Sequence, residues 1–168
     1  MGGTIKVIAT RRSTISGLVS ANGLGGSVEW SAGENVLLRA GGPVDGETAG
    51  RIRAESVHVD TPLASLDGDI ESDNITGTAQ TVNILSSING AEIQDGIDIS
   101  ANGATVNVEA GTYVESLVID KEGLKLAGKD GAILQAETAE DLIKVTAGNV
   151  NIDPIVFDGM GLSDYGIN

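Results

Sequence analysis

Short runs of Val, Ile, Leu and Thr recur along the whole chain, and each run is bounded by glycine, asparagine or aspartate. Within a run such as residues 105–108 (Thr-Val-Asn-Val), apolar and polar side chains alternate, which is typical of a strand with one buried face. The sequence therefore predicts an all-β protein made of many short strands. The runs lie at residues 4–8, 14–19, 27–30, 35–39, 50–54, 56–59, 81–84, 105–108, 116–119, 124–126, 132–134, 142–145, 149–152 and 155–157.

The spacing of these runs favours a parallel β-solenoid over a sandwich or a barrel. Val106, Leu124 and Ile143 hold related positions at nearly equal intervals along the chain. A constant step of about 20 residues suits one turn of stacked β-structure. Few Asn-Gly or Asp-Gly pairs separate alternating runs, so hairpins are not the expected connections. Stacked turns bring equivalent residues about 4.8 Å apart, a spacing that aliphatic side chains fill well. Asparagines such as Asn107 and Asn151 are expected to stack there as hydrogen-bonded ladders.

One short helix is expected to interrupt the strands, near residues 90–101. Asn89 is a good N-cap residue, and Glu92, three positions later, can close a capping box with it. This helix directly precedes the most regular strands. We therefore expect it to cover the open end of a stack, where aliphatic side chains and unpaired backbone groups would otherwise meet water.

Within this helix, helical spacing separates a buried face from a solvent face. Ile93 and Ile97 lie four positions apart and are expected to pack inward. Glu92 and Asp95 are expected to face solvent.

Composition narrows the choice of partners and chemistry. The 168 residues include 10 basic and 24 acidic side chains, a formal charge of −14 that disfavours nucleic acid and acidic membranes as partners. No apolar run approaches the roughly 18 residues of a membrane span. The chain has no cysteine and one histidine, which excludes thiolate sites and a multi-histidine zinc centre. That histidine, His58, lies between Val57 and Val59 and is expected to point outward from a strand.

A longer pattern covers residues 81–128. The helix motif Ile-Gln-x-x-Ile at 93–97 precedes Gly-x-Thr-Val-x-Val-x-x-Gly-x-Tyr-x-Glu at 103–115 and Leu-x-Ile-x-Lys-x-x-Leu-x-Leu-x-Gly at 117–128. This succession resembles the N-terminal cap and first coils of pectin-lyase-like right-handed parallel β-helices, with a weaker continuation to residue 157. The resemblance implies a right-handed solenoid with a capping helix, and it carries little information about a reaction because unrelated functions share this scaffold.

Residues 1–80 form a glycine-rich β-solenoid-like segment. Residues 33–42 and 52–60 resemble the coils of filamentous-haemagglutinin-like surface proteins, which are also right-handed β-helices in very long exported chains. The two resemblances divide the chain into residues 1–80 and a truncated pectin-lyase-like β-helix over residues 81–168. The first residues lack the features of a signal peptide, which favours an interior piece of a longer chain. The two resemblances together imply that this longer chain is a large extracellular or cell-surface protein.

The strongest chemical feature is an acidic run at residues 67–73. On a strand, alternation would place its four carboxylates on one face. Clustered carboxylates suit Ca²⁺, the one cofactor suggested by the sequence, although the run does not follow the twelve-residue helix-loop-helix calcium pattern. The competing interpretation is a solvated acidic edge that discourages edge-to-edge pairing. The candidate ligands are Asp67, Asp69, Glu71 and Asp73.

The sequence favours a non-catalytic role, although it leaves enzymatic activity open. The resemblance implies that lyases of this class use a basic residue beside carboxylate-bound Ca²⁺ on a central coil. Here all five arginines precede the expected helix, and few coils follow it. We therefore expect a structural or adhesive module that binds carbohydrate or a host or cell-surface ligand and self-associates through the open ends of its stack. The alternatives are an N-terminal fragment of a polysaccharide lyase or glycoside hydrolase, and a viral tail or capsid-associated β-helix.

Overall fold

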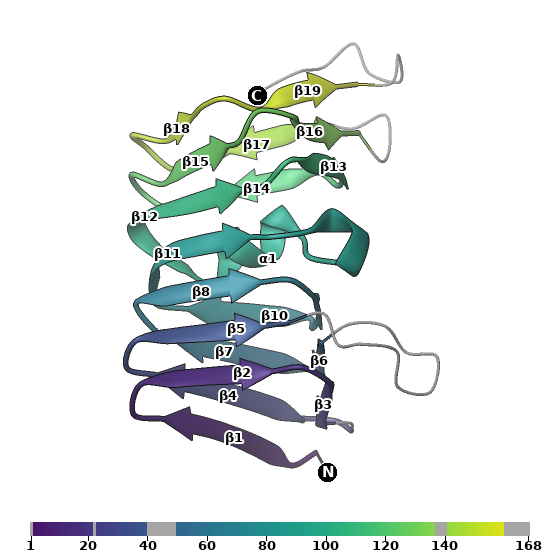
Figure 1. Cartoon of the computed structure of the whole chain (residues 1–168), viewed down its shortest axis with the longest axis vertical. Helices are drawn as coiled ribbons and strands as arrows, with labels where there is room; N and C mark the ends of the chain where they lie inside the picture. Colours follow the sequence, from purple (N-terminus) through teal and green to yellow (C-terminus); the bar gives the residue numbers. More distant parts are fainter. Residues whose placement is uncertain (1, 22, 40–49, 137–140, 160–168) are drawn as a thin grey trace.

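The strands of this protein pair in parallel throughout the residues described by the structure. The computed structural model describes residues 2–21, 23–39, 50–136 and 141–159, so residues 40–42 of one surface-protein-like motif lie outside it. Successive strands are stacked along the long axis of the molecule from the N-terminus towards the C-terminus (Figure 1). The all-β prediction is confirmed, together with parallel sheets and one short α-helix.

One sheet of seven strands runs along the whole stack (Figure 1). Each of its strands pairs with the strand that the chain adds to this sheet on its next pass through the sheets, and one such pass is called a circuit. Its strands, in spatial and sequence order, are β2 (Arg12–Ile15), β5 (Asn35–Leu38), β8 (Leu63–Leu66), β11 (Ala79–Ile84), β12 (Ser100–Val108), β15 (Lys125–Gly128) and β18 (Asn151–Ile152).

In the N-terminal half, two further sheets flank the seven-stranded sheet, and the chain visits the three in a fixed order. The four-stranded sheet contains β1 (Thr4–Ala9), β4 (Ser27–Ala32), β7 (Ser56–Asp60) and β10 (Asn74–Gly77). The second sheet contains β3 (Leu18–Ala21), β6 (Arg51–Ala54) and β9 (Asp69–Glu71).

In the C-terminal half, different sheets take these places beside β12, β15 and β18. Among the described residues, only the seven-stranded sheet is common to both halves. The expected boundary after residue 80 lies within β11, a strand of this sheet. The C-terminal sheets consist of β13 (Gly111–Val114), β16 (Ala132–Gln135) and β19 (Val156–Asp158), and of β14 (Leu117–Ile119) and β17 (Ile143–Val145).

The circuits differ in length, so the expected constant step between them is wrong. The differences in circuit length lie in the connections between strands. The strands themselves stay in register, because a slip of one position would turn the buried side chains outward. Val106 accordingly lies opposite Leu126 and not Leu124. One inward column of the seven-stranded sheet, whose members are unevenly spaced along the chain, is Val36, Ala64, Val82, Val106, Leu126 and Ile152.

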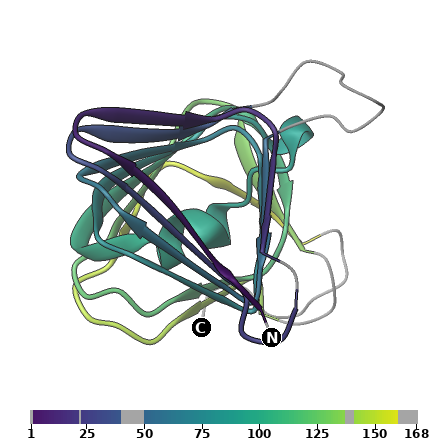
Figure 2. The ribbon, with the colours of Figure 1, turned by 90° about the horizontal axis from the view of Figure 1, so that it is seen from below.

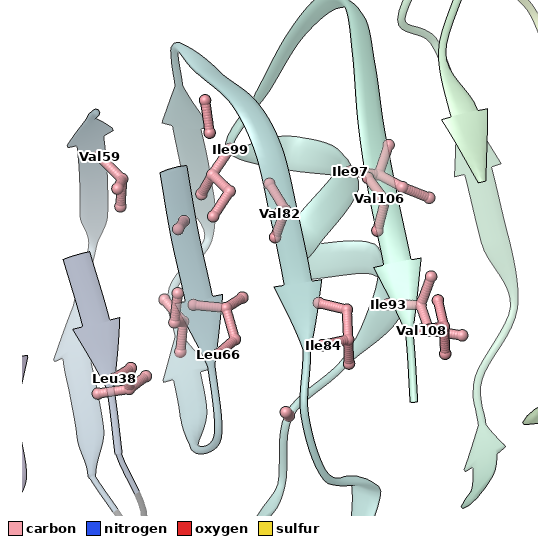
Figure 3. Close-up of a cluster of buried hydrophobic side chains, with 14 of the residues drawn as sticks. Leu38, Val59, Leu66, Val82, Ile84, Ile93, Ile97, Ile99, Val106 and Val108 are labelled. Carbon is pink, nitrogen blue, oxygen red and sulfur yellow. The ribbon is translucent and has the colours of Figure 1, made fainter. Parts of the chain in front are cut away.

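The core is a set of aliphatic columns enclosed by the sheets. Leu38, Leu66, Ile84 and Val108 follow one another along the axis and are fully buried (Figure 3). Trp30 of β4 is also fully buried, and its Nε1–H donates to Ser13 Oγ of β2 at 2.8 Å. This bond joins two consecutive circuits.

The helical residues differ from the helix expected near 90–101. A 3₁₀ turn, η1 (Ser87–Asn89), ends at Gly90, where a φ of 84° interrupts the helical path. The α-helix proper, α1 (Ile93–Asp98), is shorter than expected. Its N-cap is Glu92, which makes no side-chain cap bond, so the predicted capping box is wrong.

α1 lies inside the stack and does not cover an open end. It is found at mid-length in Figure 1 and within the outline of the ribbon in Figure 2, and it packs against β10, β11, β12 and β14. Ile93 and Ile97 are fully buried as predicted (Figure 3). Asp95 is only 4% exposed, so the expectation that it faces solvent is wrong.

Candidate functional site

The acidic run at residues 67–73 is only partly a strand. In β9, Ile70 is buried, whereas Asp69 and Glu71 lie on the outer face, as the alternation predicted. Asp67 precedes the strand, and its Oδ1 accepts a hydrogen bond from Asn89 Nδ2 at 2.8 Å. Asp73 follows the strand and is exposed. Strand geometry therefore places two of the four candidate ligands on one face.

Two arginines of the neighbouring strand face these carboxylates. The pairing of β6 with β9 sets Arg51 opposite Asp69 and Arg53 opposite Glu71. Arg51 Nε lies 3.1 Å from Asp69 Oδ2 and 3.2 Å from Glu71 Oε1, and Arg53 Nε donates to Glu71 Oε2. The hydrogen bond from Arg53 lowers the pKa of Glu71, while burial raises the pKa of Asp69 against the attraction of Arg51.

This donor set fits Ca²⁺ poorly. A calcium ion needs several carboxylate or carbonyl oxygens at about 2.3–2.6 Å, and the outer oxygens of Asp69 and Glu71 already face guanidinium groups. Across the described part of the chain, no three His, Asp or Glu side chains are arranged to hold a metal ion. A calcium site at Asp67, Asp69, Glu71 and Asp73 therefore stays a prediction from the sequence alone.

This arginine–carboxylate ladder was not predicted from the sequence, although a signal was present. Arg51-Ile52-Arg53 and Asp69-Ile70-Glu71 share the same charged–Ile–charged pattern with opposite charges. Strands that match in this way place opposite charges next to each other when they pair in parallel and in register.

An open groove of about 450 Å³ lies next to the ladder. Its lining includes Arg53, Glu55, Glu71 and Asp73, together with Leu24, which is 87% exposed. Glu55 Oε2 accepts a hydrogen bond from the Gly25 backbone N–H at 2.5 Å. The groove thus combines three carboxylates, one guanidinium and an apolar side chain, which suits contact with a polar, uncharged or weakly cationic ligand.

Polar side chains on the outer face of the seven-stranded sheet form a second ladder. Asn107 Nδ2 donates to Asn83 Oδ1 at 2.9 Å, and Asn83 Nδ2 donates to Ser65 Oγ at 3.3 Å. An asparagine ladder is therefore present, but Asn107 stacks on Asn83 of β11. Asn151, the expected partner, lies opposite Lys125.

His58 is exposed on β7 between the buried Val57 and Val59, as predicted. Its Nδ1 lies 3.0 Å from Thr76 Oγ1 on the next circuit. Glu29 lies opposite it on the preceding circuit and makes a 2.7 Å ion pair with Lys6. His58 is thus one member of an outward polar row, a position that suits a surface role better than proton transfer in an enclosed site.

A further group of titratable side chains surrounds α1. The carboxylate of Glu115, which follows β13, accepts hydrogen bonds from the backbone N–H groups of Ile93 and Gln94 at 2.8 and 2.9 Å. Burial raises the pKa of Glu115 to about 7, although these two bonds lower it. Glu115 therefore caps α1 from a distant part of the chain, a role that has no local sign in the sequence.

No protein-family model, curated protein or solved structure matches this chain. No helix in the described ranges has both the length and the apolar character needed to cross a membrane.

Proposed function

We propose that this chain is a segment of a right-handed parallel β-helix that serves as a non-catalytic structural or adhesive module of a large secreted or cell-surface protein. The observation that carries the proposal is the repeated order of circuits, β1–β2–β3, β4–β5–β6 and β7–β8–β9, with parallel pairing between equivalent strands. Parallel strands of one sheet joined by a crossover are right-handed in about 98% of cases. The resemblance of residues 81–157 to pectin-lyase-like coils and of residues 1–80 to surface-protein coils agrees with this assignment.

The outer surface suits a role in contact rather than in chemistry. Most of its basic side chains pair with carboxylates, and several of these pairs join neighbouring circuits, such as Lys6 with Glu29, Arg51 with Asp69 and Lys129 with Glu109. Such pairs fix a regular pattern of polar groups along the axis. Carbohydrate or another polar cell-surface ligand is the partner class that we assign to it, because the charge of −14 disfavours polyanions.

Self-association through the ends of the stack belongs to the same proposal. In the described residues, β1 pairs only with β4, and β19 pairs only with β16. Ile8 of β1 is 74% exposed and Val156 of β19 is 57% exposed. Unpaired strand edges of this kind readily accept a further strand, from the rest of a longer chain or from a second copy.

The β-helix assignment can be tested with paired cysteines, because the natural chain has none. Thr105 and Lys125 are register partners on the outer face of β12 and β15. Neighbouring strands are about 4.8 Å apart, within the range that a disulfide spans. The double variant Thr105→Cys/Lys125→Cys should therefore cross-link under mild oxidation. In the control Thr105→Cys/Ala127→Cys the two positions are about 8 Å apart, and cross-linking should be slow. Equal rates would contradict the register.

The non-catalytic role can be tested on a panel of polysaccharides that includes polyuronates. We expect binding to at least one polymer, measured with the labelled chain, and no turnover, measured by reducing ends and by the ultraviolet absorbance of unsaturated products. Turnover would replace the adhesive assignment. Absence of binding to every polymer and to intact cells would remove it.

The groove beside Arg53 favours one alternative, a fragment of a polysaccharide lyase or glycoside hydrolase. It sets a basic side chain beside Glu55, Glu71 and Asp73. If this alternative holds, Arg53→Ala abolishes turnover of a polyuronate. The matched control Arg11→Ala, an exposed arginine that pairs with Glu34, leaves turnover unchanged.

A further inference from the structure

Asp95 is a carboxylic acid placed in the interior of the molecule. Its side chain belongs to α1 and is 4% exposed, and its Oδ2 has no hydrogen-bond partner. Leaving an ionised oxygen buried without a partner is costly, because that oxygen loses its hydration without a compensating bond. Burial outweighs the backbone hydrogen bond that the carboxyl group accepts from Ile70, which lowers its pKa. The arrangement therefore favours a protonated Asp95.

The charged groups that face Asp95 are themselves acidic. They are Glu92 at the N-cap of α1, Asp69 on β9 and Glu115 after β13. The four strands packed against α1 contain no titratable side chain in their sequences, Asn74–Gly77, Ala79–Ile84, Ser100–Val108 and Leu117–Ile119. The nearby cations interact with other carboxylates: Arg51 makes an ion pair with Asp69, and the charge of Lys121 opposes the rise that burial causes in the pKa of Asp98, the other acid of α1.

We propose that α1 is a pH-sensitive plug: it stays packed in the stack while Asp95 is protonated, and it loosens from β10, β11, β12 and β14 when Asp95 ionises. The plug lies at the level where the sheets of the N-terminal half give way to those of the C-terminal half. Its loosening would therefore weaken the junction between the halves. This device does not depend on what the outer surface binds.

The direction of the effect follows from proton linkage. Burial, and next the charge of Glu92, raise the pKa of Asp95 to about 8, against a value of about 3.9 for a solvated aspartate. The packed state thus holds a proton that the opened state releases. The resulting stabilisation is complete below about pH 4 and is lost as the pH rises through about 8. For Asp95 alone, the opening constant should rise roughly 50-fold between pH 6 and pH 8.

Hydrogen exchange of the α1 amides measures this opening directly. The reporter is the Ile99 N–H, which donates to the Asp95 backbone oxygen at 3.1 Å, with the Val59 amide of β7 as an internal reference. Rates at pH 6 and pH 8 are corrected for the intrinsic pH dependence of exchange. In the natural chain we expect the opening constant at Ile99 to rise by at least tenfold and that at Val59 to change much less.

Two variants separate the proposal from general effects of charge. In Asp95→Asn the rise at Ile99 should fall well below that in the natural chain, because the amide does not ionise and only Glu115, whose pKa burial raises to about 7, still titrates in this range. In the control Asp130→Asn, an exposed aspartate, the full rise should persist. Glu92→Gln removes one facing carboxylate and should move the midpoint of opening to lower pH, a test that holds even if Asp95→Asn fails to fold. A natural chain without the rise, an Asp95→Asn variant that retains the full rise, or an unchanged midpoint in Glu92→Gln would each overturn the proposal.

Discussion

Trp30 allows the packing between consecutive circuits to be tested at a single hydrogen bond. Its indole is fully buried, and its N–H donates to Ser13 Oγ at 2.8 Å. Ser13→Ala keeps the β-carbon and removes the acceptor. A buried donor left without a partner costs about 1–3 kcal/mol. Because Ser13 itself is only partly buried, water can reach the site, and we expect a loss of about 1–2 kcal/mol in the free energy of unfolding.

The assay is urea unfolding followed by tryptophan fluorescence. The chain contains one tryptophan, so the signal reports the circuits around β2 and β4 alone. With an m-value of about 1–3 kcal/mol/M, the expected loss lowers the urea midpoint by roughly 0.3–2 M. Thr14→Ala, the outward-facing neighbour in β2, is the matched control and should change stability by less than about 0.5 kcal/mol. Equal midpoints for the two variants would refute the contact.

Three other outcomes follow from the same structure. Leu126→Ala empties part of an inward column and should cost about 2–5 kcal/mol in thermal or urea unfolding, whereas the exposed Lys125→Ala should cost almost nothing. The melting temperature of the natural chain should be lower at pH 8.5 than at pH 5.5, because burial raises the pKa of Asp95 to about 8 and that of Glu115 to about 7; a higher value at pH 8.5 would show that other groups dominate. Millimolar Ca²⁺ should leave the melting temperature unchanged, since arginines already face Asp69 and Glu71, and a clear rise would restore the calcium site.

The strands were the part of the fold that the sequence predicted best. Alternation is a local property, and it placed Val57 and Val59 inside and His58 outside without any knowledge of the partner strand. The register of distant strands was not local. Arg51 lies opposite Asp69 because few residues separate their two strands along the chain. Leu18 also lies opposite Arg51, although a much longer stretch of chain separates those two strands.

The helix shows a second limit of sequence patterns. Helical spacing separated Ile93 and Ile97 from Asp95, which would indicate one buried and one exposed face on the surface of a protein. α1 instead packs against four strands, so Asp95 is buried as well. Its N-terminal amides are capped by Glu115, which is distant in sequence, and no short motif around Asn89 or Glu92 contains that information.

The change of sheets at mid-length has a mechanical consequence. In the described residues, three ladders of hydrogen bonds join the circuit β4–β5–β6 to the circuit β7–β8–β9, whereas at the level of α1 the only strand ladder is the pairing of β11 with β12. A tether pulled between the two ends of the chain should therefore give way first at this level. The molecule would then separate into two stiffer pieces before either piece unravels.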